Sequence, residues 1–156
     1  LSHDFRPQAF EATFALVAPR LRRILQEAAR EEVFINVDAE HYHYRDLVLR
    51  IFGKVLLETP ELAQYSQTGI VVQAYLRDGA KHLMDVVELA RRRGIRMPIR
   101  LVKGAYWDAE TIEGAAHQFI PPQFLNKEES DLHFRQLAYL ALQNHDYIQL
   151  AVGSHN

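Results

Sequence analysis

Four short β-rich runs separated by helical segments constrain the fold of this chain more than any other feature. Each run is almost continuously apolar, which is typical of strands covered on both faces. Each connection is long enough for a crossover helix, so the pattern predicts a parallel sheet covered by helices. The predicted strands are Val33–Val37, Ile70–Tyr75, a run that starts at Ile99 after Pro98, and Tyr147–Val152.

Apolar residues at three- and four-residue spacing predict amphipathic helices in the remaining segments. The first helix includes Phe10 and Leu25, and Pro19 is predicted to kink or divide it. The three cations of Arg91–Arg93 are predicted to form a solvated helix end, where they oppose the negative end of the helix dipole. The residues predicted to cap helices are Thr59, Asp78 and Asn126 at N-termini and Gly94 at a C-terminus.

Two architectures satisfy this order of elements: an open doubly wound sheet and part of a (β/α)8 barrel, which usually has about 250 residues. The first strand is not followed by G-x-G-x-x-G, and G-x-x-x-x-G-K-[ST] occurs nowhere in the chain. The two strongest signatures of an open nucleotide-binding sheet are therefore missing. We predict an α/β fold of the (β/α)8 TIM type, incomplete because four strands cannot close a barrel.

Composition excludes several classes of function. The net charge of −2 and the pI near 6.5 give no basic field for nucleic-acid binding. The chain has no cysteine, which excludes thiolate nucleophiles, disulfides and cysteine-ligated zinc. No apolar run is long enough for a membrane span, and a cytoplasmic location is expected.

Polar residues recur where the predicted strands end. In both architectures the carboxyl ends of the strands carry the functional groups. We therefore expect the functional site at this edge of the sheet. The residues in question are Asp38, Gln73, Tyr75, Arg100, Lys103, Tyr106, His155 and Asn156.

Arg100 is the most informative of these residues, because it lies inside an apolar strand. Alternation along the strand directs Arg100 and Val102 to one face and Leu101 and Lys103 to the other. A guanidinium in such a place is expected to be buried against a partner, since an unpaired buried charge costs about 3–5 kcal/mol. The partner is either Asp38, in a structural ion pair, or a bound ligand.

The run Arg100-Leu101-Val102-Lys103-Gly104-Ala105-Tyr106-Trp107-Asp108 resembles the proline dehydrogenase domain of the bifunctional proline utilisation flavoenzymes (PutA). Residues 37–40, residues 72–75 and the closing Ser154-His155-Asn156 are similar to further motifs of that family, in the same order. The resemblance extends from about Val33 to Asn156. It implies that residues 1–156 form a partial barrel domain that starts after barrel strand one and ends at strand five.

The resemblance implies FAD-dependent oxidation of L-proline to Δ1-pyrroline-5-carboxylate, the first step of proline catabolism. In this reaction a hydride passes from the ring carbon beside nitrogen to flavin N5, and a membrane quinone then accepts the electrons. A cytoplasmic location, with peripheral contact at the inner membrane, is implied as well. In PutA an aldehyde dehydrogenase domain is fused to this one.

The resemblance also assigns roles to single residues. It implies a catalytic group of Asp38, Arg100 and Tyr106, and a substrate pocket bordered by Asp38, Leu101 and Tyr106. Where the family commonly has Tyr-Thr-Arg-Lys, this chain has Phe124-Leu125-Asn126-Lys127, which keeps only the lysine. The implied FAD-binding residues are Gln73, Arg100, Lys103, Gly104, Trp107, Lys127, His155 and Asn156.

Three further interpretations fit parts of the sequence. One is a catalytically incompetent partial barrel that would act as a binding or assembly module. The resemblance implies a pocket lysine on strand one and a pair of arginines on the last helix, and neither is in this sequence. No turnover is therefore expected from the chain alone. A different barrel enzyme, such as a carbohydrate- or phosphate-processing one with Asp38 and Glu40 as acid and base, is disfavoured, since adjacent carboxylates at a strand end diverge. His41 and His43 match no zinc signature, and no metal is expected.

Overall fold

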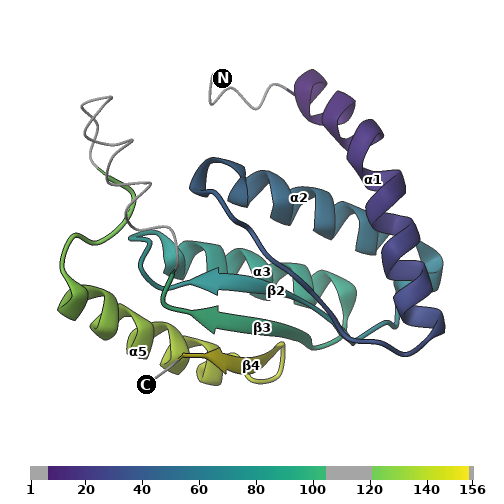
Figure 1. Ribbon diagram of the computed structural model, residues 1–156. Coiled ribbons are helices and arrows are strands. Elements are labelled where there is room, and N and C mark those ends of the chain that lie inside the picture. Colours follow the sequence, from purple (N-terminus) through teal and green to yellow (C-terminus); the bar gives the residue numbers. More distant parts are fainter. Residues whose placement is uncertain (1–6, 105–120, 155–156) are drawn as a thin grey trace.

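The structure is a computed structural model that describes residues 7–104 and 121–154, and it contains a parallel sheet with helices packed beside it (Figure 1). The strands are β1 (Ile35–Val37), β2 (Thr68–Gln73), β3 (Met97–Val102) and β4 (Ile148–Gly153). The helices are α1 (Pro7–Arg30), α2 (Tyr42–Glu58), α3 (Gly79–Arg93) and α5 (Lys127–Gln143), with a short 3-10 helix, η1 (Pro60–Leu62).

The four strands lie in the sheet in the order in which they occur in the chain. β1 pairs with β2, β2 with β3 and β3 with β4, and every pairing is parallel. A doubly wound sheet reverses its strand order at a switch point, whereas a barrel adds each strand beside the previous one. The described strands show no reversal and do not close, as predicted for part of a barrel.

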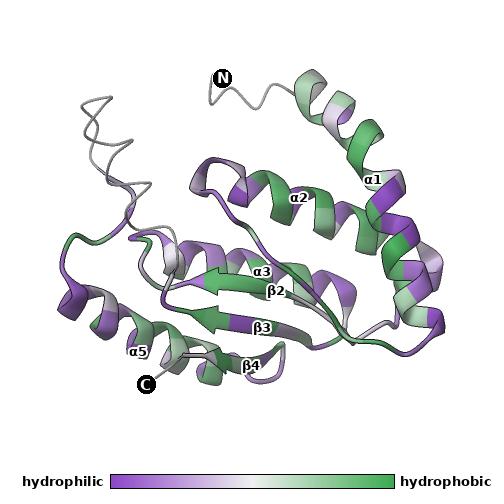
Figure 2. Ribbon diagram, viewed as in Figure 1, coloured by the Kyte–Doolittle hydropathy of each residue, from purple (hydrophilic) through white to green (hydrophobic). Residues whose placement is uncertain are grey.

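The hydrophobic core lies between the sheet and the helices. Alternate residues of β2 and β3, including Ile70, Val72 and Leu101, belong to one buried cluster with Val86 of α3 and Leu137 of α5. Figure 2 shows β2 and β3 as largely hydrophobic, with hydrophilic residues spread over the helices. This is the face to which alternation directed Leu101, so Arg100 and Val102 lie on the opposite face.

The predicted strands are confirmed with shifted boundaries. β1 is shorter than expected, because Val33 and Phe34 are both 50% exposed and lie before the strand. β2 begins at Thr68, and beyond its end Tyr75 still donates a backbone hydrogen bond to Lys103 over 2.7 Å. Pro98 lies within β3 and does not precede it.

The ends and the interior of the helices differ in part from what local sequence patterns predict. Pro19 was predicted to kink or divide the first helix, and of these two outcomes the division is wrong, because α1 continues through Pro19. Pro19 is exposed to solvent. Asn126 caps α5 as predicted, accepting from Glu128 N over 2.8 Å. Thr59 and Asp78 make no side-chain cap, because the side chains of Arg22 and Arg45 occupy them.

Arg93 also differs from its prediction. Arg91 and Arg92 are exposed, but Arg93 is only 9% exposed and donates to the carbonyl oxygens of Leu62 (3.0 Å) and Tyr65 (2.8 Å). Burial lowers its pKa to about 10. Arg93 thus fastens the end of α3 to the segment after η1.

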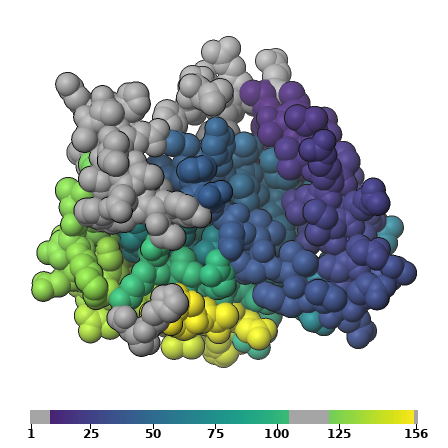
Figure 3. Space-filling view, in the orientation of Figure 1, coloured from purple at the N-terminus to yellow at the C-terminus, as the bar shows by residue number. Residues whose placement is uncertain are grey.

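Large apolar side chains are exposed on α1, α5 and β4. Figure 3 shows α1 at the right of the molecule, α5 at the left and β4 along the bottom. On α5, Leu132, Tyr139 and Leu142 are 50%, 65% and 58% exposed, and Val152 of β4 is 59% exposed. β4 is an end strand of the described sheet, so its outer edge is open to a further strand.

Gly94 ends α3 as predicted, and its substitution tests the cap. Its φ is 70°, and an added Cβ would meet nothing within 4 Å. Gly94→Ala is therefore expected to lower the free energy of unfolding by about 1 kcal/mol through backbone strain alone. Gly94→Asn is the matched control, since asparagine tolerates this conformation. In urea unfolding, Gly94→Asn should lower the free energy of unfolding by less than Gly94→Ala does. Equal losses would contradict a conformational origin.

Candidate active site

The carboxyl ends of β1, β2 and β3 meet at one edge of the sheet, where Asp38 and Arg100 form an ion pair. Arg100 Nη2 lies 2.7 Å from both carboxylate oxygens of Asp38, and Asn36 Nδ2 donates to Asp38 Oδ1 over 2.7 Å. The side chains of Arg100 and Asp38 are 41% and 58% exposed. Among the described residues Arg100 is thus only partly buried, contrary to the expectation, and its partner is Asp38.

The Asp38–Arg100 pair reaches across β2, the strand between β1 and β3. Val71 of β2 is the register partner of Arg100 and is only 3% exposed. Gln73, at the end of β2, is 5% exposed, and its Nε2 donates to the carbonyl oxygen of Ala39 over 2.9 Å. Its buried Oε1 has no hydrogen-bond partner among the described residues, and this leaves one acceptor available to a donor.

Two lysines with a predicted role converge on one carboxylate. Lys103 Nζ lies 2.6 Å from Asp131 Oδ1, and Lys127 Nζ lies 2.5 Å from Asp131 Oδ2. Hydrogen bonds from Lys103 and then Lys127 lower the pKa of Asp131 to about 2. The cluster joins the end of β3 to the first turn of α5, so both ammonium groups lie at this same edge.

Gly104 and Leu101 have different positions relative to this edge. Gly104 has a φ of 140°, and an added Cβ would lie 2.1 Å from the ring of Tyr75, so only glycine fits. Leu101 is fully buried on the helix side of the sheet, opposite Arg100. This placement gives no support to the prediction that Leu101 borders a substrate pocket. Tyr106, Trp107, His155 and Asn156 lie outside the described residues.

A buried ion pair that the sequence did not reveal lies behind the edge. Arg45, whose side chain is 3% exposed, directs Nη1 and Nη2 at the two carboxylate oxygens of Asp78, each over 2.7 Å. Asp46 Oδ1 accepts from the same guanidinium, and Tyr42 donates to Asp78 Oδ2 over 3.3 Å. Burial alone would raise the pKa of Asp78. The hydrogen bonds and the positive charge of Arg45 have the larger combined effect, so the pKa of Asp78 is lowered.

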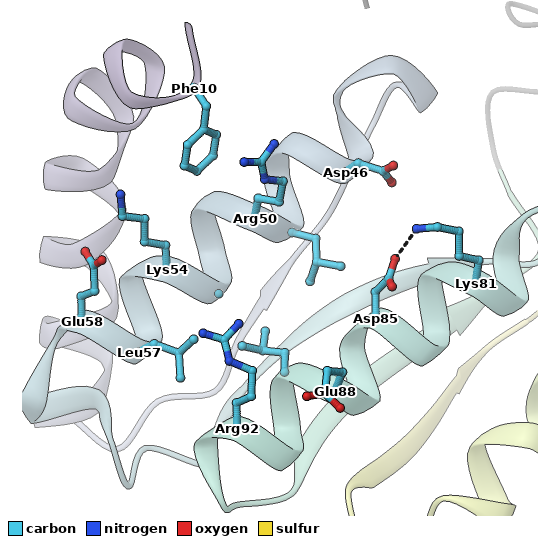
Figure 4. A pocket seen from close by; sticks show the side chains of 13 residues that line it. Phe10, Asp46, Arg50, Lys54, Leu57, Glu58, Lys81, Asp85, Glu88 and Arg92 are labelled. Carbon is cyan, nitrogen blue, oxygen red and sulfur yellow. Dashed lines mark hydrogen bonds and ion pairs between the residues drawn. The ribbon is translucent and has the colours of Figure 1, made fainter. Parts of the chain in front are cut away.

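A cavity among the described residues lies away from the carboxyl edge of the sheet. A groove of about 620 Å³ runs between α2 and α3 beside α1 (Figure 4), and Lys54, Leu57 and Arg92 are among its lining residues. None of the predicted site residues lines it. Within the residues that the structure describes, no three histidine, aspartate or glutamate side chains gather as metal ligands.

The edge therefore combines a half-exposed guanidinium, a buried amide with an unused acceptor, and two lysine ammonium groups. The chemistry of such a set suits an anionic group and a planar ring with both donors and acceptors. The orphaned Oε1 of Gln73 fits the N–H of a flavin ring, and the lysines fit its phosphates. The residues present are thus compatible with the flavin that the resemblance implies.

A parallel sheet whose strands follow the chain order without reversal, with polar groups gathered at its carboxyl edge, is the arrangement of part of a (β/α) barrel. Comparison with known proteins narrows this class of fold. The family model for proline dehydrogenase matches residues 2–156, and the chain belongs to the proline dehydrogenase family. In the part of the chain that the structure describes, no helix has the length and apolarity of a membrane span.

Several relatives support this assignment. The chain is 35% identical to the bifunctional protein PutA of Escherichia coli (strain K12) over 142 residues, and 29% identical to proline dehydrogenase 1 of Bacillus subtilis (strain 168) over 141 residues. These matches cover 88% and 90% of this chain but 10% and 39% of those proteins. The chain thus spans only a part of the relatives it matches.

Solved structures agree with the fold. The crystal structure of PutA from Bdellovibrio bacteriovorus inactivated by N-propargylglycine superimposes with a TM-score of 0.90 at 38% identity. That match covers 95% of this chain and 15% of the other. The described sheet therefore has the arrangement of part of a PutA barrel.

His82 of α3, near Arg45, gives the fold a predictable response to pH. His82 is 1% exposed, and burial, followed by the charge of Arg45, lowers its pKa from 6.5 to about 4. The native state thus keeps His82 neutral, whereas the unfolded chain binds a proton below pH 6.5. The contribution of neutral His82 to the free energy of unfolding is fully present above pH 6.5. It falls by on the order of 3 kcal/mol as the pH drops toward 4.

The measurement is urea unfolding of the protein between pH 7 and pH 4.5. His82→Leu is expected to flatten the dependence on pH, because it removes the titrating group. His145→Leu is the matched control, since the His145 side chain is 72% exposed and should leave the slope unchanged. An unaltered slope in His82→Leu would refute this origin.

Proposed function

We propose that the protein catalyses the FAD-dependent oxidation of L-proline to Δ1-pyrroline-5-carboxylate. The observation that carries this proposal is the Asp38–Arg100 pair at the carboxyl edge of the sheet, in a chain of the proline dehydrogenase family. An exposed pair of this kind contributes little to stability, about 0.2–1 kcal/mol, which favours a role in binding or chemistry. The reaction would be the first step of proline catabolism.

Five described residues are proposed to hold FAD. Gln73 would offer its unused Oε1 to the isoalloxazine ring, and Arg100 would lie beside that ring. Lys103 and Lys127 would bind the phosphates or the adenosine part, and Gly104 would let the chain turn close to the cofactor. When bound, FAD supplies the acceptor for the hydride that leaves proline. Trp107, His155 and Asn156 complete the proposed set by resemblance.

The chain's own residues then prepare the reaction. Asp38 fixes the direction of the Arg100 guanidinium by accepting from Nη2 with both oxygens. A cation held in advance stabilises the negative charge that develops on the ring during transfer, and it requires no reorganisation at that moment. Asp38 and Tyr106 would border the substrate. Leu101 would support this wall from the core without contacting proline.

The proposal extends to the protein as a whole. Residues 1–156 would supply barrel strands two to five, and the remaining strands and the clamp for the proline carboxylate would come from other parts of the protein. Electrons would pass to a membrane quinone through peripheral contact at the inner membrane. A fused aldehyde dehydrogenase domain, as in PutA, would oxidise the product.

One observation favours a second candidate. Arg100 already pairs with Asp38, so this cation has a partner without a cofactor, as it would in a catalytically incompetent binding or assembly module. The purified full-length protein distinguishes the two candidates directly. A yellow chromophore that proline bleaches is expected for the enzyme, and a colourless folded protein for the module.

Arg100→Met tests the assignment of the guanidinium. Loss of one preorganised charge is expected to lower proline-dependent reduction of a dye acceptor about a hundredfold, because the developing negative charge loses its partner. Arg96→Met is the matched control: Arg96 precedes β3 at the opposite edge and donates to the carbonyl oxygen of Ile148 over 3.2 Å. Undiminished activity in Arg100→Met would rule out the assignment.

A further inference from the structure

The turn after β1 carries much of the candidate site but has little strand support. β1 has three residues, and all of them are partly exposed. Asp38, which pairs with Arg100, follows directly, and then Ala39, whose carbonyl oxygen accepts from Gln73. Three residues of strand pairing hold such a turn weakly, so its position depends on contacts made beyond the strand.

Arg45 provides such a contact. It lies in the first turn of α2, which begins at Tyr42 directly after this turn, and it binds Asp78, the residue before α3. Both bonds are 2.7 Å long and join two nitrogens to two oxygens, an arrangement that fixes orientation as well as distance. The pair therefore links the start of α2 to the turn that follows β2.

We propose that the Arg45–Asp78 ion pair positions the active site. It holds the turn after β1 against the turn after β2, so that Asp38 and the Ala39 carbonyl stay aligned with Arg100 and Gln73. Arg45 is too deeply buried to contact substrate, since its side chain is 3% exposed. Its effect on catalysis rests on the proposed function, whereas its effect on the turn does not.

Asp46 offers a matched control within the same ion cluster. It accepts from Arg45 over 2.9 Å, but it is the neighbouring residue in α2 and cannot link α2 to α3. Asp78→Asn removes the bridging carboxylate and keeps a residue that is compatible with a helix start. Asp46→Asn removes a carboxylate from the same guanidinium and leaves the bridge intact.

Hydrogen–deuterium exchange of the full-length protein measures the link without reference to activity. In Asp78→Asn we expect peptides covering residues 38–44 to exchange at least about tenfold faster, and in Asp46→Asn we expect no change. Equal acceleration in both variants, or none in Asp78→Asn, overturns the proposal. Should Asp78→Asn not fold, Arg45→Lys keeps the buried cation but cannot form the paired bonds, and the same local acceleration is expected.

Steady-state kinetics with proline and a dye acceptor then test the consequence for catalysis. Asp78→Asn is expected to lower kcat/KM about tenfold to a hundredfold, because a displaced catalytic group loses alignment, whereas Asp46→Asn keeps the original value. Asp78→Glu, which retains the charge, is expected to recover part of the loss. Fast exchange with unchanged kcat/KM overturns the positioning role. Absence of proline oxidation in the unmutated protein refutes the proposed function, and the exchange result stands apart from it.

Discussion

The parallel pairing of β1, β2 and β3 is the constraint on which the rest of this structure depends. Because the three strands run in the same direction, their carboxyl ends meet at one edge, and residues 62 positions apart in the chain come within 2.7 Å. The helices occupy the other face, where alternate strand residues form the core. One sheet thus supplies both the stability of the fold and the assembly of its polar edge.

The two ion pairs at and behind this edge contribute differently to the stability of the fold. Arg45–Asp78 is desolvated on the arginine side, and removal of one partner from such a pair costs about 3–5 kcal/mol. Asp38–Arg100 is half-exposed and contributes little to folding. The buried pair therefore fixes the backbone, whereas the exposed pair adds little to folding and leaves the Arg100 guanidinium accessible to a ligand.

Periodicity predicted the strands, the helices and the parallel sheet because those depend on local pattern. It failed where a distant residue decided the outcome. Asp78 and Thr59 had the side chains of helix caps, but arginines 33 and 37 positions away occupy them. The exposure of Arg100 also lay beyond local pattern, since it depends on which elements cover β3. Of the unpredicted groups, only Asp131 had a local signal, its four-residue spacing from Lys127.

Asp131 also bears on the turn before α5. By the resemblance, an arginine and a lysine are expected where this chain has Asn126 and Lys127, so one expected cation is absent from this turn. Lys103 and Lys127 approach the same carboxylate, and its low pKa keeps it charged throughout the physiological range. A carboxylate between two ammonium groups reduces their mutual repulsion and leaves the cluster with one net positive charge. The chain thereby keeps a fixed cationic position at the start of α5 without the arginine.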